Sequence, residues 1–174
     1  MKQINNEEKK PKVAVIMGSD SDFPTLKDGI KVLKEFGVDV DVMVCSAHRT
    51  PDRAAEFAKN ADSNGFDVII AAAGKAAHLP GVLAAYTPLP VIGVPIKSST
   101  MDGLDSLLSI VQMPGGIPVA TVAIDGAENA ALLAVQILSV GYPHLRESMK
   151  EYKKKLENKV EEKNRALQEK LLEM

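Results

Sequence analysis

The chain has 174 residues, a formal net charge of −2 and a single cysteine. This length is typical of one domain, which buries roughly 70% of its unfolded surface and needs no disulfide or metal to fold. One cysteine excludes an internal disulfide framework and favours a reducing, cytoplasmic compartment, and the near-neutral charge argues against nucleic acid as a partner. Glycine, proline or charge interrupts every apolar run well before the roughly 18 residues of a membrane span, so we expect no membrane partner.

Residues 1–10, MKQINNEEKK, are polar and contain no apolar signal core. We interpret them as a solvated leader to a single α/β domain over residues 11–141. Within it, KVAVIMG (12–18) is a β-branched run that ends at glycine, and DVDVMVC (39–45) alternates as a half-exposed strand would. Three further runs are nearly all apolar, which suits parallel strands buried on both faces; they span 67–74, 90–96 and 118–124.

Helical patterns separate the apolar runs, near residues 24–36, 51–64, 79–87, 102–112 and 127–140. Pro24 and Pro51 fit first helical turns, and Thr50 fits an N-cap. Gly37 and Gly65 fit helix ends. Five β-α units are too few for a barrel, and the polar second strand is the best candidate for a sheet edge. We therefore predict a three-layer α/β/α, flavodoxin-like (Rossmann-like) parallel five-stranded sheet of order 2-1-3-4-5. Ligands would bind beyond the carboxyl ends of the strands.

Residues 142–174 have a different composition. From Pro143 onward they contain nine Lys or Arg and seven Glu. A narrow apolar stripe follows three-, four- and seven-residue spacing along this predicted helix; it comprises Leu145, Met149, Tyr152, Leu156, Val160 and Leu167. Such a helix needs a partner, so we predict a helical extension that packs on neighbouring subunits, the alternative being a solvated helix. The acidic residues nearly cancel the basic ones, which again argues against nucleic acid.

Polar segments follow four of the predicted strands, and the first is GSDSD (18–22). Ser19 and Ser21 offer hydroxyls beside a helix N-terminus, where free N–H groups favour anions. The carboxylates of Asp20 and Asp22 repel a bare phosphate but accept hydrogen bonds from ribose hydroxyls. A sugar phosphate suits this mixture best, the alternative being a cluster that caps its own helix.

The second segment is SAHRTP (46–51). Ser46 and Arg49 are both suited to phosphate, which arginine binds with a bidentate fork. His48 lies between them and exchanges a proton near neutral pH. Taken alone, a loop histidine is more often a surface residue without a chemical role. Arg49, taken alone, could equally be a partner in a surface ion pair. The neighbouring first segment favours a shared anion site instead.

The third segment, GKAAHLPG (74–81), contains small residues and a second histidine, His78, for which a loop-orienting role is favoured over acid/base chemistry. The fourth is KSSTMDGLDS (97–106). A metal site is not indicated, because three histidines and one cysteine show no closely spaced ligand pairs. Cys45 ends an apolar strand and reads as a small buried residue rather than a nucleophile.

Several motifs together resemble the family of N5-carboxyaminoimidazole ribonucleotide mutases, the class I PurE family. They are GSDSD, SAHRTP, AAHLPG, GLDSLLSIVQMPGGIPVATVAI and NAALLAVQIL, in order over about residues 12–141. The resemblance implies a flavodoxin-like homo-octamer whose C-terminal segments contribute to subunit contacts. It also implies an isomerase of purine biosynthesis that moves a carboxyl group from the exocyclic amine of an imidazole ribonucleotide to ring carbon C4. No metal, nucleotide cofactor or ATP is implied.

Carried over by motif, the resemblance makes His48 the catalytic acid/base. Ser19 and Asp22 would bind the ribose 5′-phosphate part of the nucleotide, and Arg49, helped by Ser46, its phosphate. The third segment would shape the pocket for the migrating carboxylate through Ala73, Gly74, His78 and Leu79. Lys75 departs from the family pattern of glycine or a small apolar residue there. We expect its side chain to point outward, the alternative being a pairing with the substrate carboxylate.

Three other functions stay open at this point. The nearest is an aminoimidazole ribonucleotide carboxylase that uses free CO2, although intact SAHRTP and HLPG favour a mutase. A non-catalytic nucleotide-binding or receiver-like module is a second, because this fold hosts many functions; a receiver needs an acidic residue where this chain has AAAGKAAH. A third is an assembly scaffold built on the long C-terminal helix.

Overall fold

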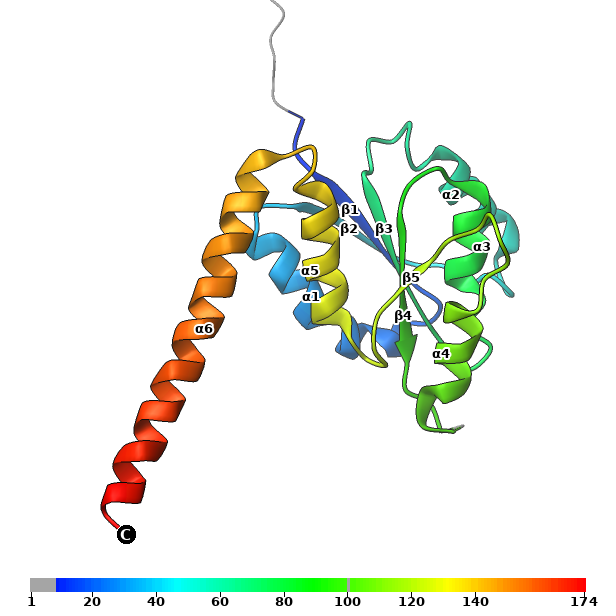
Figure 1. Cartoon of the computed structure of the whole chain (residues 1–174). Coiled ribbons are helices and arrows are strands. Elements are labelled where there is room, and N and C mark those ends of the chain that lie inside the picture. Colours follow the sequence, from blue (N-terminus) through cyan, green and yellow to red (C-terminus); the bar gives the residue numbers. More distant parts are fainter. Residues whose placement is uncertain (1–8, 100) are drawn as a thin grey trace, which may run out of the picture.

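The computed structural model describes residues 9–99 and 101–174, so positions 1–8 of the predicted leader lie outside the described residues. Five parallel strands form one sheet in the order β2-β1-β3-β4-β5, as predicted, with the polar strand β2 at one edge (Figure 1). The strands are β1 (Lys12–Met17), β2 (Asp39–Val44), β3 (Val68–Gly74), β4 (Val91–Ile96) and β5 (Ala120–Thr121).

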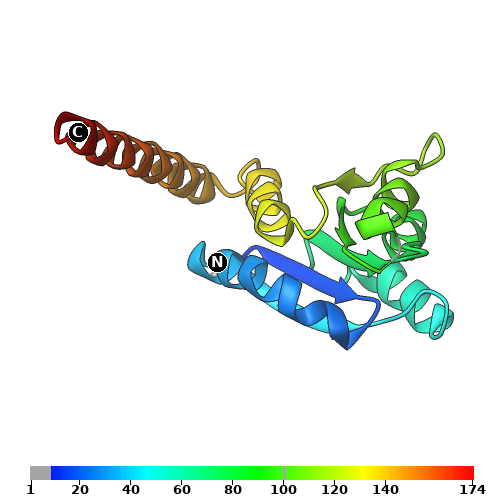
Figure 2. The same cartoon turned by 90° about the horizontal axis from the view of Figure 1, so that it is seen from below.

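Helices cover both faces of this sheet (Figures 1 and 2). They are α1 (Phe23–Glu35), α2 (Pro51–Asn60), α3 (Leu79–Tyr86), α4 (Leu104–Val111), α5 (Ala127–Leu138) and α6 (Pro143–Leu172). Two short 3₁₀ turns, η1 (Asp20–Asp22) and η2 (Met101–Gly103), precede α1 and α4. Helices α1 and α5 pack on one face with the start of α6, and α2, α3 and α4 pack on the other.

Strand β1 shows how the sequence divides between the two faces. Successive side chains of a strand point to opposite sides of the sheet. Val13, Val15 and Met17 therefore join the core beneath α1 and α5. Ala14 and Ile16 join the core beneath α2 and α3. All five are buried, as expected for a central parallel strand.

The fifth strand is far shorter than the predicted run 118–124. Only Ala120 and Thr121 pair in register, with Ile92 and Gly93 of β4. Beyond them the Asp125 N–H still donates to the carbonyl oxygen of Pro95 at 2.8 Å. Pro95 has no N–H to return the bond, so the regular ladder stops short of it. The helix bounds also shift by a few residues, most of all at α2, which ends at Asn60.

Glycine has a packing role where α1 meets α5. A Cβ added at Gly29 would overlap the carbonyl oxygen of Ala127. Only a residue without a side chain lets the two helices approach this closely. Gly37, by contrast, has φ of 74° and ends α1 in the left-handed conformation, as predicted. Gly65 has φ of 80° but ends the turn that follows α2, not the helix itself, which corrects the prediction for that position.

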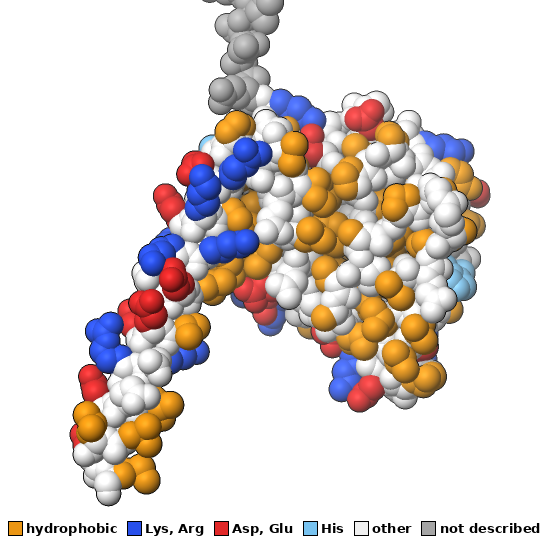
Figure 3. Space-filling model, in the orientation of Figure 1, with side chains coloured by type: hydrophobic (Ala, Val, Ile, Leu, Met, Phe, Trp, Pro, Cys, Tyr) orange, Lys and Arg blue, Asp and Glu red, His pale blue; other side chains and the backbone are white. Residues whose placement is uncertain are grey.

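The long helix α6 divides into two parts. Leu145 and Met149 are buried against the body, and the ring of Tyr152 lies 5.8 Å from that of Phe36. Beyond Tyr152 the helix projects into solvent (Figure 1), and Figure 3 shows hydrophobic side chains along this projecting part. The exposed stripe comprises Leu156 (43%), Val160 (66%) and Leu167 (53%). Among the described residues, no helix is long and apolar enough to cross a membrane.

Candidate active site

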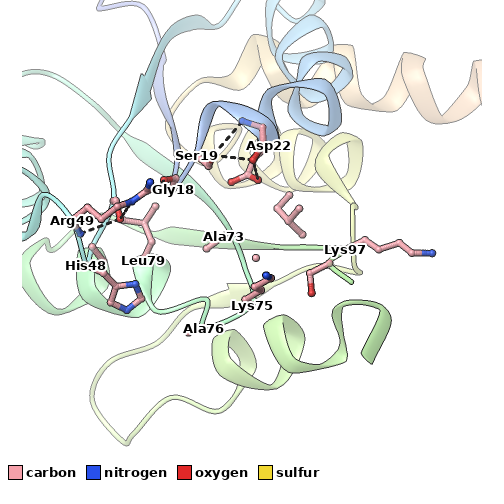
Figure 4. Close-up of a pocket in the computed structure, with 16 residues that line it drawn as sticks. Gly18, Ser19, Asp22, His48, Arg49, Ala73, Lys75, Ala76, Leu79 and Lys97 are labelled. Carbon is pink, nitrogen blue, oxygen red and sulfur yellow. Dashed lines mark hydrogen bonds between the residues drawn. The ribbon is translucent and has the colours of Figure 1, made fainter. Parts of the chain in front are cut away.

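A cavity of about 600 Å3 lies at the carboxyl ends of the first four strands, where the topology predicts a ligand site (Figure 4). The first three polar segments and the end of β4 all contribute to its lining, which joins distant parts of the sequence. The lining residues are Gly18, Ser19, Ser21, Asp22, Ser46, Ala47, His48, Arg49, Ala73, Gly74, Lys75, Ala76, Leu79, Ile96, Lys97 and Ser98.

The first turn is held by its own serines. The Ser19 hydroxyl oxygen accepts a hydrogen bond from the Ser21 N–H at 3.3 Å, so Ser19 caps the turn η1. The Ser21 hydroxyl lies 2.8 Å from the same oxygen. The capping interpretation therefore holds for Ser19, which also lines the cavity; its ligand-binding role stays a prediction.

Asp22 is the buried acid of the cavity, with 7% of its surface exposed. Burial raises the pKa of its carboxyl group, because the charged form loses its hydration. Hydrogen bonds from the Ser19 backbone and the Ser21 side chain lower the pKa in part, and the neighbouring Asp20 raises it again. The pKa of Asp22 is therefore raised above its ordinary value.

The second loop is a closed ring of hydrogen bonds, which corrects the expected role of Thr50. Thr50 precedes α2 as predicted, but its side chain makes no cap bond to the helix. Its hydroxyl instead donates to the Ser46 carbonyl oxygen at 2.9 Å and accepts from the Ser46 N–H at 3.0 Å. The Arg49 N–H donates to the Ser46 hydroxyl oxygen at 3.2 Å. Because Thr50 binds backward into the loop, it holds residues 46–50 in one conformation.

Arg49 connects the second loop to the first. Its Nη2 donates to the Gly18 carbonyl oxygen at 3.1 Å, and its Nε lies 3.5 Å from the Ser46 hydroxyl oxygen. The Gly18 N–H in turn donates to the carbonyl oxygen of Ala72 in β3 at 3.1 Å. A guanidinium is thus held in place beside the hydroxyls of Ser19 and Ser46, in a geometry suited to a phosphate group.

His48 lies at the cavity and contacts the second histidine of the site. Its Nε2 is 2.8 Å from Nδ1 of His78, and the two rings are nearly perpendicular, at 79°. His78 itself does not line the cavity. The structure therefore brings these two predicted residues together, with His48 at the wall and His78 behind it.

Small and apolar residues form the floor of the cavity. Ala73 and Leu79 are buried, with 6% and 2% exposed, and Gly74 ends β3 between them in the chain. Cys45, expected to be a packed residue, is also buried at 2% exposure. Its sulfur lies 3.8 Å from the Thr50 hydroxyl oxygen, below the loop that carries His48.

Lys75 belongs to the lining of the cavity and is at the same time exposed, so the expected outward direction of its side chain stays a prediction. Its φ of 53° places it in the left-handed region, which glycine adopts freely. For a residue with a Cβ this conformation costs on the order of 1 kcal/mol. A lysine in such a position indicates a local constraint that the sequence alone does not reveal.

The sequence places the segment after β4 among the four polar segments at the strand ends, but it singles out no residue there. Ile96, Lys97 and Ser98 line the cavity. Lys97 Nζ pairs with Asp102 at 3.3 Å, and its N–H donates to the Asp125 side chain at 2.9 Å. The signal was present, because β4 lies next to β3 in the predicted sheet order and its end therefore adjoins the third segment.

Comparisons with known proteins agree with this geometry. The family model for AIR carboxylase matches residues 12–159. The N5-carboxyaminoimidazole ribonucleotide mutase of Pyrococcus horikoshii is 59% identical over 166 residues, which cover 95% of this chain and 94% of that protein. The crystal structure of Treponema denticola PurE has a TM-score of 0.81 at 30% identity, covering 88% of this chain and 96% of that one.

One further relative carries a different name. The phosphoribosylaminoimidazole carboxylase of Ogataea methanolica is 63% identical over 135 residues, which are 78% of this chain but only 25% of that longer protein. The shared region is thus one part of a larger polypeptide there. On the extent of the family match and the identity to full-length relatives, this chain belongs to the AIR carboxylase family, the PurE proteins.

Proposed function

We propose that the protein is an isomerase of purine biosynthesis that converts N5-carboxyaminoimidazole ribonucleotide to 4-carboxy-5-aminoimidazole ribonucleotide. The observation that carries this proposal is the meeting of three groups in one cavity: the Arg49 guanidinium, the His48 imidazole and a floor of small residues. Relatives named as this mutase match the chain along nearly its whole length, which supports the assignment.

The cations and hydroxyls of the first two loops suit the nucleotide phosphate. Arg49 would bind it with a charge-assisted fork, and Ser19 and Ser46 would add hydroxyl donors. Asp22 would accept hydrogen bonds from the ribose hydroxyls. Binding energy from these remote groups would fix the imidazole over the floor formed by Ala73, Gly74 and Leu79.

His48 would carry the proton out and back. It protonates the amine nitrogen of the carbamate, the nitrogen–carbon bond breaks, and CO2 leaves with aminoimidazole ribonucleotide beside it. Ring carbon C4 then attacks the CO2 and forms the new carbon–carbon bond. His48 finally removes the proton from C4, so no net proton is consumed. A cavity that excludes water would hold CO2 near C4 until it reacts.

His78 would act as a positioning residue for His48. Its Nδ1 lies 2.8 Å from His48 Nε2, so the two nitrogens share one proton between them. The tautomer of His78 would therefore decide which nitrogen of His48 carries a hydrogen.

A carboxylase that combines aminoimidazole ribonucleotide with free CO2 is the second candidate, because a relative of that name shares 63% identity. The match reaches only 25% of that longer protein, whereas it spans 94% and 93% of two relatives named as mutases. The whole-length similarity favours the mutase.

Assay of both substrates with the purified protein tests the proposal. We expect rapid turnover of the carbamate and slow turnover of aminoimidazole ribonucleotide with bicarbonate. Turnover of the second substrate alone would overturn the mutase assignment in favour of the carboxylase. Absence of both activities would favour a binding module or a scaffold.

We also propose that the protein works in the cytoplasm as a homo-oligomer, an octamer. The exposed stripe of α6 supports an assembly, and so does a second apolar row beside the site. On η2 and α4 the row comprises Met101 (63% exposed), Leu104 (40%), Leu108 (45%) and Val111 (49%). Exposed apolar rows of this length mark surfaces that bind another protein surface. In this proposal residues 11–141 form the catalytic domain and 142–174 the extension that contacts neighbouring subunits.

A further inference from the structure

Lys75 occupies an unusual place in the backbone of the cavity. It is the first residue after β3, in the loop that leads to α3, and its φ is 53°. A lysine side chain does not bond to its own backbone to favour this conformation, as asparagine or aspartate does. Residues held in such conformations cluster at ligand sites, where another contribution offsets the strain. The question is what the lysine contributes.

The charged end of Lys75 is unpaired in the part of the chain that the structure describes. The other two long cations of the lining are engaged: Lys97 pairs with Asp102 at 3.3 Å, and Arg49 donates to Gly18. For Lys75 the structure contains no ion pair or hydrogen bond of its side chain within residues 9–99 and 101–174. An ammonium group is thus available at the cavity without first breaking a protein contact.

Lys75 and Arg49 occupy different sides of the cavity. In Figure 4, Arg49 and His48 come from the second loop at one side, and Lys75 lies beside Ala76 toward Lys97 at the other. A ligand that spans the cavity therefore meets one cation at each end. The substrate and product of the proposed reaction each carry two anionic groups, the phosphate and, at the far end, a carbamate or a carboxylate.

We propose that Lys75 is a specificity-determining residue whose ammonium group pairs with the carboxyl group of the substrate and of the product. The inference rests on the proposed function. It assigns the phosphate to Arg49 and the migrating carboxyl group to Lys75. This also accounts for a lysine where glycine would fit the backbone without strain.

The charges of the reacting groups determine how Lys75 affects KM and kcat. The carbamate and the ring carboxylate are both negative, so Lys75 binds the two ground states alike, whereas the CO2 between them is neutral. A cation that stabilises both ends of the reaction and not its middle lowers KM without raising kcat. It also distinguishes carboxylated nucleotides from aminoimidazole ribonucleotide, which lacks the carboxyl group.

Binding measurements on two nucleotides test the proposal. Lys75→Met should weaken the affinity for 4-carboxy-5-aminoimidazole ribonucleotide about tenfold and change that for aminoimidazole ribonucleotide less than twofold. Lys75→Arg should restore most of the difference, because it keeps the charge. Calorimetry measures both constants. The proposal is overturned if both nucleotides weaken equally, or if product affinity is unchanged in Lys75→Met.

Lys97→Met is the matched control, since it removes a cation that lines the same cavity but is already paired. We expect it to leave the ratio of the two affinities unchanged. If Lys75→Met fails to fold, Lys75→Gly serves instead, because glycine adopts φ near 53° freely. Failure of the proposed function is separable: the wild-type protein would then not turn over the carbamate at all, whereas failure of the Lys75 assignment leaves wild-type turnover intact.

Discussion

Nε2 of His48 lies 2.8 Å from Nδ1 of His78, although the two residues are 30 positions apart in the chain. One ring must donate and the other accept, because two N–H groups at this distance would repel each other. The contact thus ties the tautomer of one ring to that of the other.

Replacement of His48 by asparagine should lower kcat for the carbamate about a thousandfold, since general acid–base catalysis contributes roughly 10²- to 10⁴-fold. The side chain is exposed, so the melting temperature should stay within about two degrees of the wild type. His144→Asn is the control, because it removes a histidine outside the cavity. Full activity in the His48 variant would refute the catalytic assignment.

Replacement of His78 by asparagine should have a smaller effect on kcat, about tenfold to a hundredfold, because His48 remains but loses the partner that sets its tautomer. ¹⁵N NMR of the His48 ring reports which nitrogen is protonated and should change in this variant. An unchanged ring spectrum would show that the contact with His78 does not set the tautomer of His48.

Arg49→Gln should weaken binding of the product nucleotide about tenfold to a hundredfold, because a charge-assisted bond is lost. The corresponding nucleoside, which lacks the phosphate, should bind the variant and the wild type equally. Arg53→Gln, on the exposed surface of α2, is the matched control. Equal weakening of nucleotide and nucleoside would show that Arg49 acts by holding Gly18 rather than by binding phosphate.

Asp22→Asn should stabilise the folded protein at neutral pH. Burial raises the folded-state pKa of this carboxyl group above its unfolded value, so folding favours the neutral form. Any stability from that preference is present below the unfolded pKa and is lost as the pH rises through the folded one. At pH 7 the buried carboxylate therefore lowers the free energy of unfolding, and asparagine removes this cost.

The expected gain is a rise in melting temperature of about one to three degrees at pH 7, which shrinks as the pH falls toward the usual aspartate range. Calorimetric scans at intervals from pH 7 down to pH 4 check the trend. Asp39→Asn on the edge strand β2 is the control, since its side chain is exposed and Asp39 is not among the groups that shift the pKa of Asp22. A gain that is independent of pH would contradict the electrostatic origin.

Charged substitutions in the exposed stripe of α6 test whether this helix holds the oligomer together. Leu156→Glu combined with Val160→Glu should convert the oligomer to smaller species, because two charges would enter an apolar contact. Asn158→Glu with Gln168→Glu adds the same charge to the helix, at positions that are not three or four residues from Leu156, Val160 or Leu167. Light scattering after size exclusion measures the mass. Equal masses for the two double variants would show that this stripe lies outside the subunit contacts.

Much of the sheet was predictable because the apolar pattern of most strands lies within the strand itself. The buried run at 67–74 and the half-polar run at 39–45 determined which strand is central and which is at the edge. The run at 118–124 misled, since none of its residues is buried in the structure and only Ala120 and Thr121 pair in register with β4. Whether a ladder forms there depends on Pro95, a residue in another strand, which no local pattern reveals.

The cavity was predictable to the level of segments and not of contacts. Sheet order places the loops after β1, β2 and β3 together, and the cavity draws on all three. The pairing of His48 with His78 depends on side-chain rotamers and on how two loops approach. Thr50 shows the same limit, because its hydroxyl has a choice between the helix and the loop, and the closed ring with Ser46 prevails.

The close contact between Gly29 and Ala127 has a consequence for how this protein tolerates mutation. Helix α1 begins directly after the turn that carries Ser19 and Asp22, and Gly29 sets its distance from α5. Any side chain at position 29 would push α1 outward and carry that turn with it. Natural variation at this position should therefore be as restricted as at the cavity itself, although Gly29 touches no ligand.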